Sequence, residues 1–331
     1  MEEATKVAER LYSEAAQFSI EDNPDFMERA VNIPKEIGER IRASWGADEL
    51  SLYGRFDFIL AKDGTPKILE FNADTPTSLL EASVIQWQWK EDVFPECDQF
   101  NGIHEGLVQS WKDIFPKKGE IHFAGALENN EDTGTLQYLA STAMEAGFST
   151  RVLDMQALDL QNGRFFDPAG ELVNRCFKLY PWEWMVDESP DGCLAEMEWL
   201  EPIWKLVMSN KAILATLYEL FPDSPYVLPC YLSRPRSGLF CKKPIFSREG
   251  HNVSVVDIRD WEEYVRIAET EGDYNTGAYV YQEYVEPTAY SGRYPVIGSW
   301  IIGGEAAGIG IRENRMEVTD NLSEFVPHII G

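Results

Sequence analysis

The segment LYGRFDFILAKDGTPKILEFN, residues 52–72, constrains the fold most, because it predicts one defined β-hairpin. Apolar and polar residues alternate over residues 53–60 and again over residues 67–72, and KDGT at residues 62–65 is a turn signal. With Asp63 and Gly64 as the central turn residues, Lys62 faces Thr65. The same register pairs Phe58 with Leu69, Asp57 with Glu70, Phe56 with Phe71, and Arg55 with Asn72. One face of the hairpin is then apolar, with Phe56, Phe58, Leu69 and Phe71.

The other face of this hairpin is polar, with Arg55, Asp57, Glu70 and Asn72. Like charges directly opposite each other on a sheet are destabilising. Two carboxylates and an amide oxygen in this arrangement therefore lead us to expect a cation that holds them together.

The overall composition limits the class of protein. The chain has 331 residues, 44% of them hydrophobic, which is enough for a core, and a formal net charge of -27. This charge argues against binding to nucleic acid or to an anionic membrane surface. The five cysteines are scattered without C-x-x-C spacing, and no run of about 18 apolar residues occurs. We expect a soluble cytoplasmic protein with reduced thiols.

Most of the chain reads as alternating helices and strands. Residues 1–50 form helices broken near Asn23 and Pro34, and a helix capped by Thr77 or Ser78 buries Leu79, Leu80, Val84 and Trp87. Residues 121–155 read as a βαβ unit with Gly147 as the helix C-cap, and FFDPAGELV reads as a second hairpin. Later we expect a helix in SNKAILATLYELF, a helix near DWEEYVRIAE, and strands in LFCKKPIF, AYVYQEYVE, YPVIGSWIIGG and AAGIGIRE.

Three later segments carry candidate ligand-binding residues. Lys211 lies in the first turn of a helix that we expect Ser209 to cap, where a nearby anion would stabilise the cation; a solvent-exposed lysine is the alternative. FCKKPIFSREGHNV places two lysines at a strand end and then a small-residue loop suited to phosphate, or else an ordinary charged loop. Arg312 shares a strand face with Gly310, which would leave room for a ligand, unless it is simply an edge-strand charge.

Taken together, these signals predict a nucleotide triphosphate site with a divalent cation on oxygen ligands. Magnesium suits carboxylates and phosphates because it is small and demands octahedral oxygen ligation. The classical P-loop and the G-x-G-x-x-G pattern are both missing from the sequence, so this would be a different kind of nucleotide site.

Ten sequence blocks in order resemble the synthetase part of the glutathionylspermidine synthetase family, closest to its shorter bacterial members without an amidase domain. They are GRFDF, LEFNADTPTSLLEA, QWQWKED, KLYPWEWM, SNKAIL, KKPIFSREGHNV, YQEY, YPVIGSW, GIGIRE and TDNLSEFVPH. The resemblance covers residues from about 50 to the end. The family carries an additional N-terminal segment that we expect this chain to lack.

The resemblance implies an α/β (α+β) protein with an ATP-grasp-like fold in permuted chain order. It implies a helical segment at 1–50, a metal-ligand hairpin and helix at 51–118, an α/β substrate-side subdomain at 119–199 and a nucleotide-binding subdomain at 200–331. Asp57, Glu70 and Asn72 resemble the Mg²⁺ ligands, and Arg55 and Arg312 the catalytic arginines near the transferred phosphate. The residues that resemble ATP-binding ones are Lys211, Lys243, the loop of Ser247, Arg248, Glu249 and Gly250, and the adenine hinge of Gln282, Glu283 and Tyr284.

The implied activity is that of a Mg²⁺- and ATP-dependent carboxylate–amine ligase. A glutathione-like acid would attack the γ-phosphate of ATP, and a polyamine-like amine such as spermidine would then displace phosphate from the acyl-phosphate. Two alternatives remain open at this point: a non-catalytic ATP-binding module that contacts a partner, and a small-molecule kinase.

Overall fold

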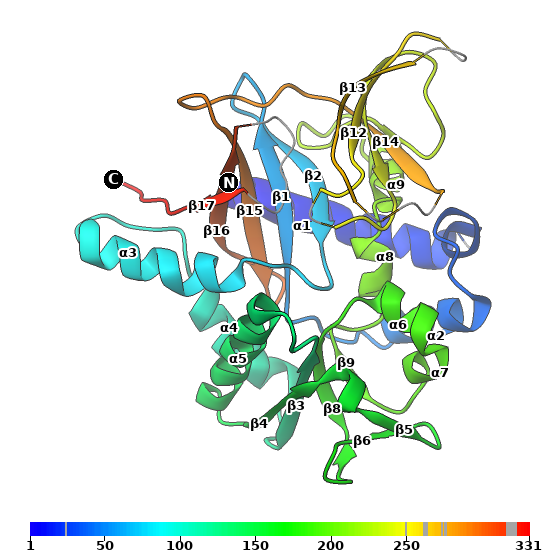
Figure 1. Cartoon of the computed structure of the whole chain (residues 1–331), viewed down its shortest axis with the longest axis vertical. Coiled ribbons are helices and arrows are strands. Elements are labelled where there is room, and N and C mark those ends of the chain that lie inside the picture. The colour runs from blue at the N-terminus through cyan, green and yellow to red at the C-terminus, as the bar shows by residue number, and fades with distance from the viewer. Residues whose placement is uncertain (24, 249, 261–263, 273, 275–276, 316–322) are drawn as a thin grey trace.

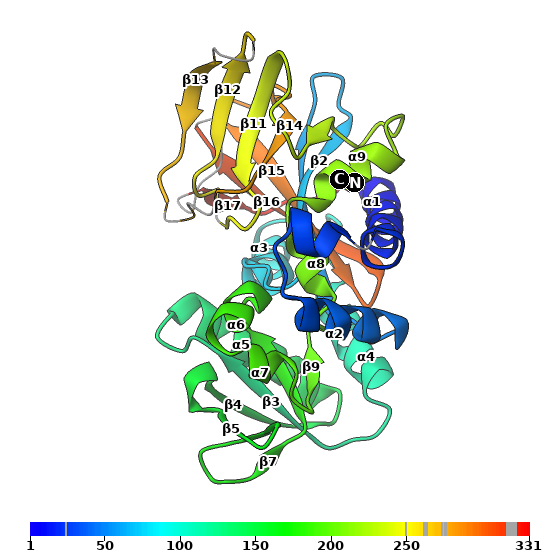
Figure 2. The same ribbon diagram turned by 90° about the vertical axis from the view of Figure 1, so that its right-hand side faces the viewer.

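The structure is a computed structural model that describes residues 1–23, 25–248, 250–260, 264–272, 274, 277–315 and 323–331. Figure 1 shows a central sheet, a smaller sheet above it and an α/β unit below it, and Figure 2 shows the same three parts from the side. Among the described residues, the helices are all too short or too polar to cross a membrane.

The first 50 residues are helical, as predicted. They form α1 (Glu2–Gln17), the π-helical turns η1 (Phe18–Asp22) and η2 (Phe26–Ala30), and α2 (Lys35–Gly46). Helix α1 covers the apolar face of the central sheet, where the ring of Tyr12 packs edge-on against Phe56 and Phe71.

The central sheet is antiparallel and joins two distant parts of the chain in the order β17-β16-β15-β1-β2. Its strands are β1 (Tyr53–Leu60), β2 (Pro66–Asn72), β15 (Tyr294–Ile302), β16 (Glu305–Asn314) and β17 (Glu324–Val326). Because β1 pairs with both β2 and β15, the predicted hairpin lies beside strands that follow it by more than two hundred residues.

The hairpin of β1 and β2 follows the predicted register only at its open end. Asp57 lies opposite Glu70 as predicted, but Phe58 pairs with Ile68 and not with Leu69. Leu69 is the extra residue of a β-bulge, so its predicted place on the apolar face is wrong and Ile68, only 1% exposed, takes that place.

The turn of this hairpin also differs from the prediction. The N–H of Ala61 donates to the carbonyl of Thr65 at 3.0 Å, so Ala61, and not Lys62, faces Thr65. The three-residue loop ends at Gly64, whose φ of 83° is in the left-handed region that glycine favours. This one-residue shift and the bulge at Leu69 cancel, which is why the polar pair further along remains opposed.

The smaller sheet is also antiparallel, in the order β10-β14-β11-β12-β13. Its strands are β10 (Cys230–Tyr231), β11 (Gly238–Pro244), β12 (Ser254–Ile258), β13 (Tyr264–Glu269) and β14 (Tyr279–Glu283). The helix predicted near residues 260–269 is wrong, because residues 264–269 form an edge strand that pairs with β12; residues 261–263 lie outside the described part. Long-range pairing here overrides a local pattern of good helix formers.

The α/β unit contains the predicted βαβ motif. Strands β3 (Glu120–Gly125) and β4 (Ser149–Asp154) are parallel and are joined by α5 (Asn130–Glu145), after which Gly147 has a φ of 98°. The sheet order is β4-β3-β8-β9, with β8 (Arg175–Leu179) and β9 (Glu198–Leu200). A three-stranded sheet contains the predicted second hairpin and comprises β5 (Asp159–Gln161), β6 (Arg164–Phe166) and β7 (Leu172–Val173).

The remaining helices connect or cover these sheets. They are η3 (Glu81–Ile85), α3 (Gln86–Val93), α4 (Ile103–Ile114), η4 (Met155–Ala157), α6 (Trp182–Glu188), α7 (Pro190–Cys193), α8 (Lys205–Ser209) and α9 (Ile213–Leu220).

Helix α3 and the turn η3 before it are oriented differently from the prediction. Leu79 is buried as expected, but Val84 is 40% and Trp87 42% exposed. Gln86 is fully buried instead, because its amide donates to the carbonyl of Ile309 at 2.8 Å and its oxygen contacts Nδ1 of His328 at 2.9 Å. Hydrogen bonds to distant backbone and to the C-terminal segment therefore decide which face of this helix points inward.

Candidate functional site

A cavity between the central and the smaller sheet brings the predicted site residues together. The space between protein atoms here is about 1220 Å³, including open solvent at its mouth. Thirteen of the predicted residues line it, and Glu249 lies outside the described residues. The thirteen are Arg55, Asp57, Glu70, Asn72, Lys211, Lys243, Ser247, Arg248, Gly250, Gln282, Glu283, Tyr284 and Arg312.

Asp57 is the point where two arginines meet. Its carboxylate accepts hydrogen bonds from Nε and Nη2 of Arg55, at 2.7 and 3.0 Å, and from Nη2 of Arg312 at 2.8 Å. Nδ2 of Asn72 donates to the same carboxylate at 3.3 Å. Asp57 is 4% exposed, so this charge cluster is shielded from water and its attractions are stronger than at the surface.

Glu70, opposite Asp57, is held by lysines. Nζ of Lys211 lies 3.1 Å from its carboxylate. Burial alone would raise the pKa of Glu70, but the ammonium groups of Lys211 and Lys243 outweigh it and lower the pKa to about 2. Glu70 is therefore ionised across the physiological pH range.

In this structure, basic side chains provide the positive charge that the two carboxylates on the polar hairpin face require. Arg55 and Arg312 neutralise Asp57, and Lys211 neutralises Glu70. In the described part of the chain there is no group of three or more His, Cys, Asp or Glu side chains that could hold a metal. Asp57, Glu70 and Asn72 nevertheless fit Mg²⁺, which binds through one or two carboxylates and takes its other ligands from phosphates and water.

Lys211 reaches the cavity from the connection between α8 and α9. Its Nζ also donates to the carbonyl of Ser247 at 2.5 Å. The predicted cap is wrong: Oδ1 of Asn210 accepts from the N–H of Ala212 at 2.8 Å, whereas the hydroxyl of Ser209 turns back to Leu206 at the end of α8. Helix α8 ends at Ser209 and α9 begins at Ile213 without a side-chain cap, so the hydrogen bond of Asn210 stabilises the connection between the two helices.

Lys243 and Gln282 face the cavity from neighbouring strands, β11 and β14. Nζ of Lys243 donates to Oε1 of Gln282 at 2.7 Å and to the carbonyl of Leu69 at 3.2 Å, and Nε2 of Gln282 donates to the carbonyl of Ile68 at 3.0 Å. Gln282 is therefore a bridge between the smaller sheet and β2, and it orients Lys243 toward the cavity.

The backbone of the predicted hinge is partly committed to internal bonds. The N–H of Glu283 donates to Pro229 at 2.7 Å, and that of Tyr284 donates to Leu239 at 2.9 Å. A base edge bound beside these residues would meet carbonyl oxygens or Val285, the next residue on the cavity wall. Sequence reasoning missed the apolar part of this wall, which comprises Ile59, Leu69, Leu228, Cys241, Val253, Val285, Pro287 and Val296.

The space predicted beside Arg312 is filled. A side chain at Gly310 would meet the ring of Phe325 and the methyl group of Ala82, so Gly310 allows close packing and leaves no room for a ligand. Arg312 itself is on the cavity wall through its bond to Asp57.

A smaller second cavity adjoins the first and contains residues that sequence reasoning did not identify. It is lined by Asp74, Thr75 and Glu183, among others, and shares Lys211 and Arg248 with the first cavity. Glu183 accepts from Nε and Nη2 of Arg248, at 3.1 and 2.7 Å. Glu183 lies in the segment KLYPWEWM. The many aromatic residues of this segment favoured a core or a contact surface, so its carboxylate was not considered as a site residue.

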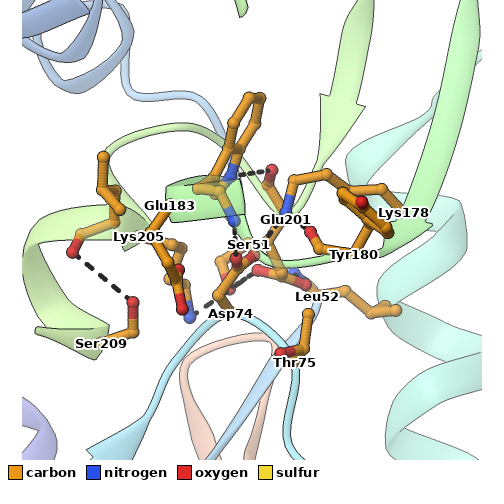
Figure 3. Close-up of polar contacts among 12 residues, drawn as sticks. Ser51, Leu52, Asp74, Thr75, Lys178, Tyr180, Glu183, Glu201, Lys205 and Ser209 are labelled. Atoms are coloured by element: carbon orange, nitrogen blue, oxygen red, sulfur yellow. Dashed lines mark hydrogen bonds and ion pairs between the residues drawn. The ribbon is translucent and has the colours of Figure 1, made fainter. Parts of the chain in front are cut away.

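Figure 3 shows a network of buried charges that includes Asp74, which lines this second cavity. Glu201 accepts from the N–H groups of Leu52 and Tyr53, at 3.1 and 3.2 Å, and Nζ of Lys205 donates to the carbonyl of Tyr53 at 3.0 Å. These bonds join the α/β unit to the start of β1, and so to the strand that carries Arg55 and Asp57.

Comparison with known proteins identifies similar sequences and folds. The model of the glutathionylspermidine synthase preATP-grasp family matches residues 1–331. A "putative acid–amine ligase" of Haemophilus influenzae is 39% identical over 87% of this chain and 77% of that protein. Trypanothione synthetase of Crithidia fasciculata is 29% identical over 92% of this chain and 51% of that protein.

Two further matches extend the comparison. The bifunctional glutathionylspermidine synthetase/amidase of Escherichia coli is 26% identical over 99% of this chain and 57% of that protein. The chain thus spans about half the length of these last two relatives. A glutathione synthetase-like effector of Globodera pallida superimposes with a TM-score of 0.59 at 10% identity, over 99% of this chain and 85% of that chain. The predicted α/β fold of the ATP-grasp type is confirmed.

Proposed function

Because the chain belongs to the glutathionylspermidine synthase preATP-grasp family, we propose that it is a Mg²⁺- and ATP-dependent ligase that joins a carboxylic acid to an amine. The family is the one that the ordered sequence blocks indicated. The relatives described above are named ligases or synthetases, in keeping with the predicted class of enzyme.

The observation that carries this proposal is the convergence of four cations on two opposed carboxylates in one cavity. Arg55 and Arg312 lie on Asp57, and Lys211 lies on Glu70 with Lys243 nearby. Phosphoryl transfer needs little covalent help from a protein and depends on positioned positive charge around the transferred group. A triphosphate entering this cavity would meet such a set.

The chain's own residues would then act as follows. Lys211 and Lys243 bind and orient the phosphates, and the arginines stabilise the charge that develops when the substrate carboxylate attacks the γ-phosphate, ADP leaves and an acyl-phosphate forms. Asp57, Glu70 and Asn72 would hold Mg²⁺, which when bound supplies further positive charge beside that phosphate. The amine then displaces phosphate from the acyl-phosphate and leaves an amide. A glutathione-like acid and a polyamine-like amine are the substrates we propose, from the relatives' names.

The test is ADP release by the purified chain with Mg-ATP and glutathione, with and without spermidine. We expect turnover that needs both substrates, stops on removal of Mg²⁺ with a chelator, and falls by at least about 10²-fold in Asp57→Ala. Asp63→Ala is the matched control, because Asp63 is exposed in the hairpin turn away from the cavity. ATP binding without turnover over a broad panel of acids and amines would favour a nucleotide-binding module. A stable phosphorylated product without an amine requirement would favour a kinase.

A further inference from the structure

Asp74 and Lys178 form an ion pair that water does not reach. Nζ of Lys178 lies 2.6 Å from Oδ1 of Asp74, and both side chains are 0% exposed (Figure 3). Lys178 also donates to the carbonyl of Tyr180 at 2.9 Å, and the N–H of Trp182 donates to Oδ2 of Asp74 at 2.8 Å. The pair therefore fixes the chain segment from which α6 begins.

Stability alone does not account for such a pair. Removing two charges from water is costly, and well-packed apolar side chains of similar volume often stabilise a fold equally well or better. A buried ion pair does fix geometry, because its hydrogen bonds are directional and because separating the two partners would leave each charge buried without a counter-charge. The question is which geometry this pair fixes.

The two partners of Arg248 follow directly in the chain after Asp74 and after Trp182, which are hydrogen-bonded to each other. Arg248 binds Glu183, which follows Trp182, and it donates to the hydroxyl of Thr75, which follows Asp74. The hydrogen bond between Asp74 and the N–H of Trp182 thus sets the spacing between Thr75 and Glu183. Arg248 lines both cavities, in the loop whose Ser247 carbonyl accepts from Lys211.

We propose that Asp74 and Lys178 are positioning residues that hold Thr75 and Glu183 at the spacing at which Arg248 binds both, and that they thereby fix Arg248 and its neighbour Ser247 beside the cavity. The inference rests on the proposed function for the meaning of that cavity as the ATP and substrate site. The ion pair acts on Arg248 through Glu183 and Thr75, the two residues that Arg248 binds.

Trypsin cleavage after Arg248 measures the state of this loop without any substrate. An arginine held by Glu183 and Thr75 is withdrawn from the protease, so cleavage follows the population of the opened loop. We expect Glu183→Gln and Lys178→Met each to be cleaved there about tenfold faster than the wild type, with the rate read by mass spectrometry. Lys205→Met is the matched control, because Lys205 is an equally buried lysine paired with Glu201 and makes no contact with Arg248.

The double variant Lys178→Met/Glu183→Gln distinguishes positioning from general loosening. If Lys178 acts through Glu183, the double variant is cleaved at the same rate as Glu183→Gln alone. If the two substitutions cause independent structural defects, their factors of increase in the cleavage rate multiply in the double variant. Urea unfolding of each variant checks that it is folded, and Asp74→Asn replaces Lys178→Met if the latter does not fold. Wild-type cleavage in a folded Lys178→Met or Asp74→Asn, or multiplied rates in the double variant, would overturn the proposal. Since no turnover is measured, this result is independent of the ligase assay.

Discussion

At the residue scale, Glu70 combines a site position with a strongly shifted charge. Lys211 and Lys243 lower its pKa from the ordinary 4.5 to about 2, so the folded chain binds a proton there less readily than the unfolded chain. The resulting stabilisation is fully present above about pH 4.5 and is lost as the pH falls toward 2. We expect the free energy of unfolding to fall over this range by up to about 3 kcal/mol through this residue.

The measurement is urea unfolding between pH 5 and the lowest pH at which the chain stays folded, for the wild type and Glu70→Gln. The variant leaves Lys211 without its carboxylate, so it starts less stable, and the difference between the two proteins should narrow as the pH falls. A difference that stays constant across this range would mean that Glu70 is not the titrating group.

At the element scale, the connection between α8 and α9 depends on one side chain. Asn210 is fully buried and its Oδ1 accepts from the N–H of Ala212, while Ser209 turns back to α8. We expect Asn210→Ala to lower the free energy of unfolding by about 1 kcal/mol through loss of this buried hydrogen bond, and Ser209→Ala to change it by much less. Equilibrium unfolding in urea compares the two alanine variants directly; equal losses of stability would contradict the dominant role of the Asn210 hydrogen bond in this connection.

At the scale of the whole molecule, the charge balance opposes compaction. The chain carries 56 acidic and 29 basic side chains, and self-repulsion of this excess favours the expanded state. We therefore expect the Tm to rise when NaCl is raised from about 0.01 M to about 0.15 M, because the screening length shortens from about 30 Å to about 8 Å. Calorimetry at both salt concentrations, with sucrose at matched osmolality as a control, measures this; a falling Tm would show that attractive ion pairs dominate.

Local patterns in the sequence were sufficient for much of the fold. The βαβ unit, the helical N-terminal segment and the strands around the cavity follow from periodicity and from turn and cap residues, which act over a few residues. The strand at 264–269 could not be predicted in this way, because it forms by pairing with β12. The inward face of α3 could not be predicted either, because Gln86 is held there by Ile309 and His328 from distant parts of the chain. The predicted position of Leu69 on the apolar face was wrong because a β-bulge inserts a single residue, which the alternation of polar and apolar residues does not reveal.

The sequence by itself determined which residues could build this site, because alternation places Asp57 and Glu70 on the polar face of the hairpin and the family's ordered blocks mark the lysines and arginines; the exact pairing of the two carboxylates held only because the loop shift and the bulge cancel. Only the tertiary structure decided which charged side chains of the site pair with each other. Arg312 reaches Asp57 from a strand that follows it by more than two hundred residues, Lys211 reaches Glu70 from a helix connection, and Glu183 holds Arg248 from another unit of the fold. The physical reason is that charge pairing depends on distance in space, which the order of residues along a chain does not contain.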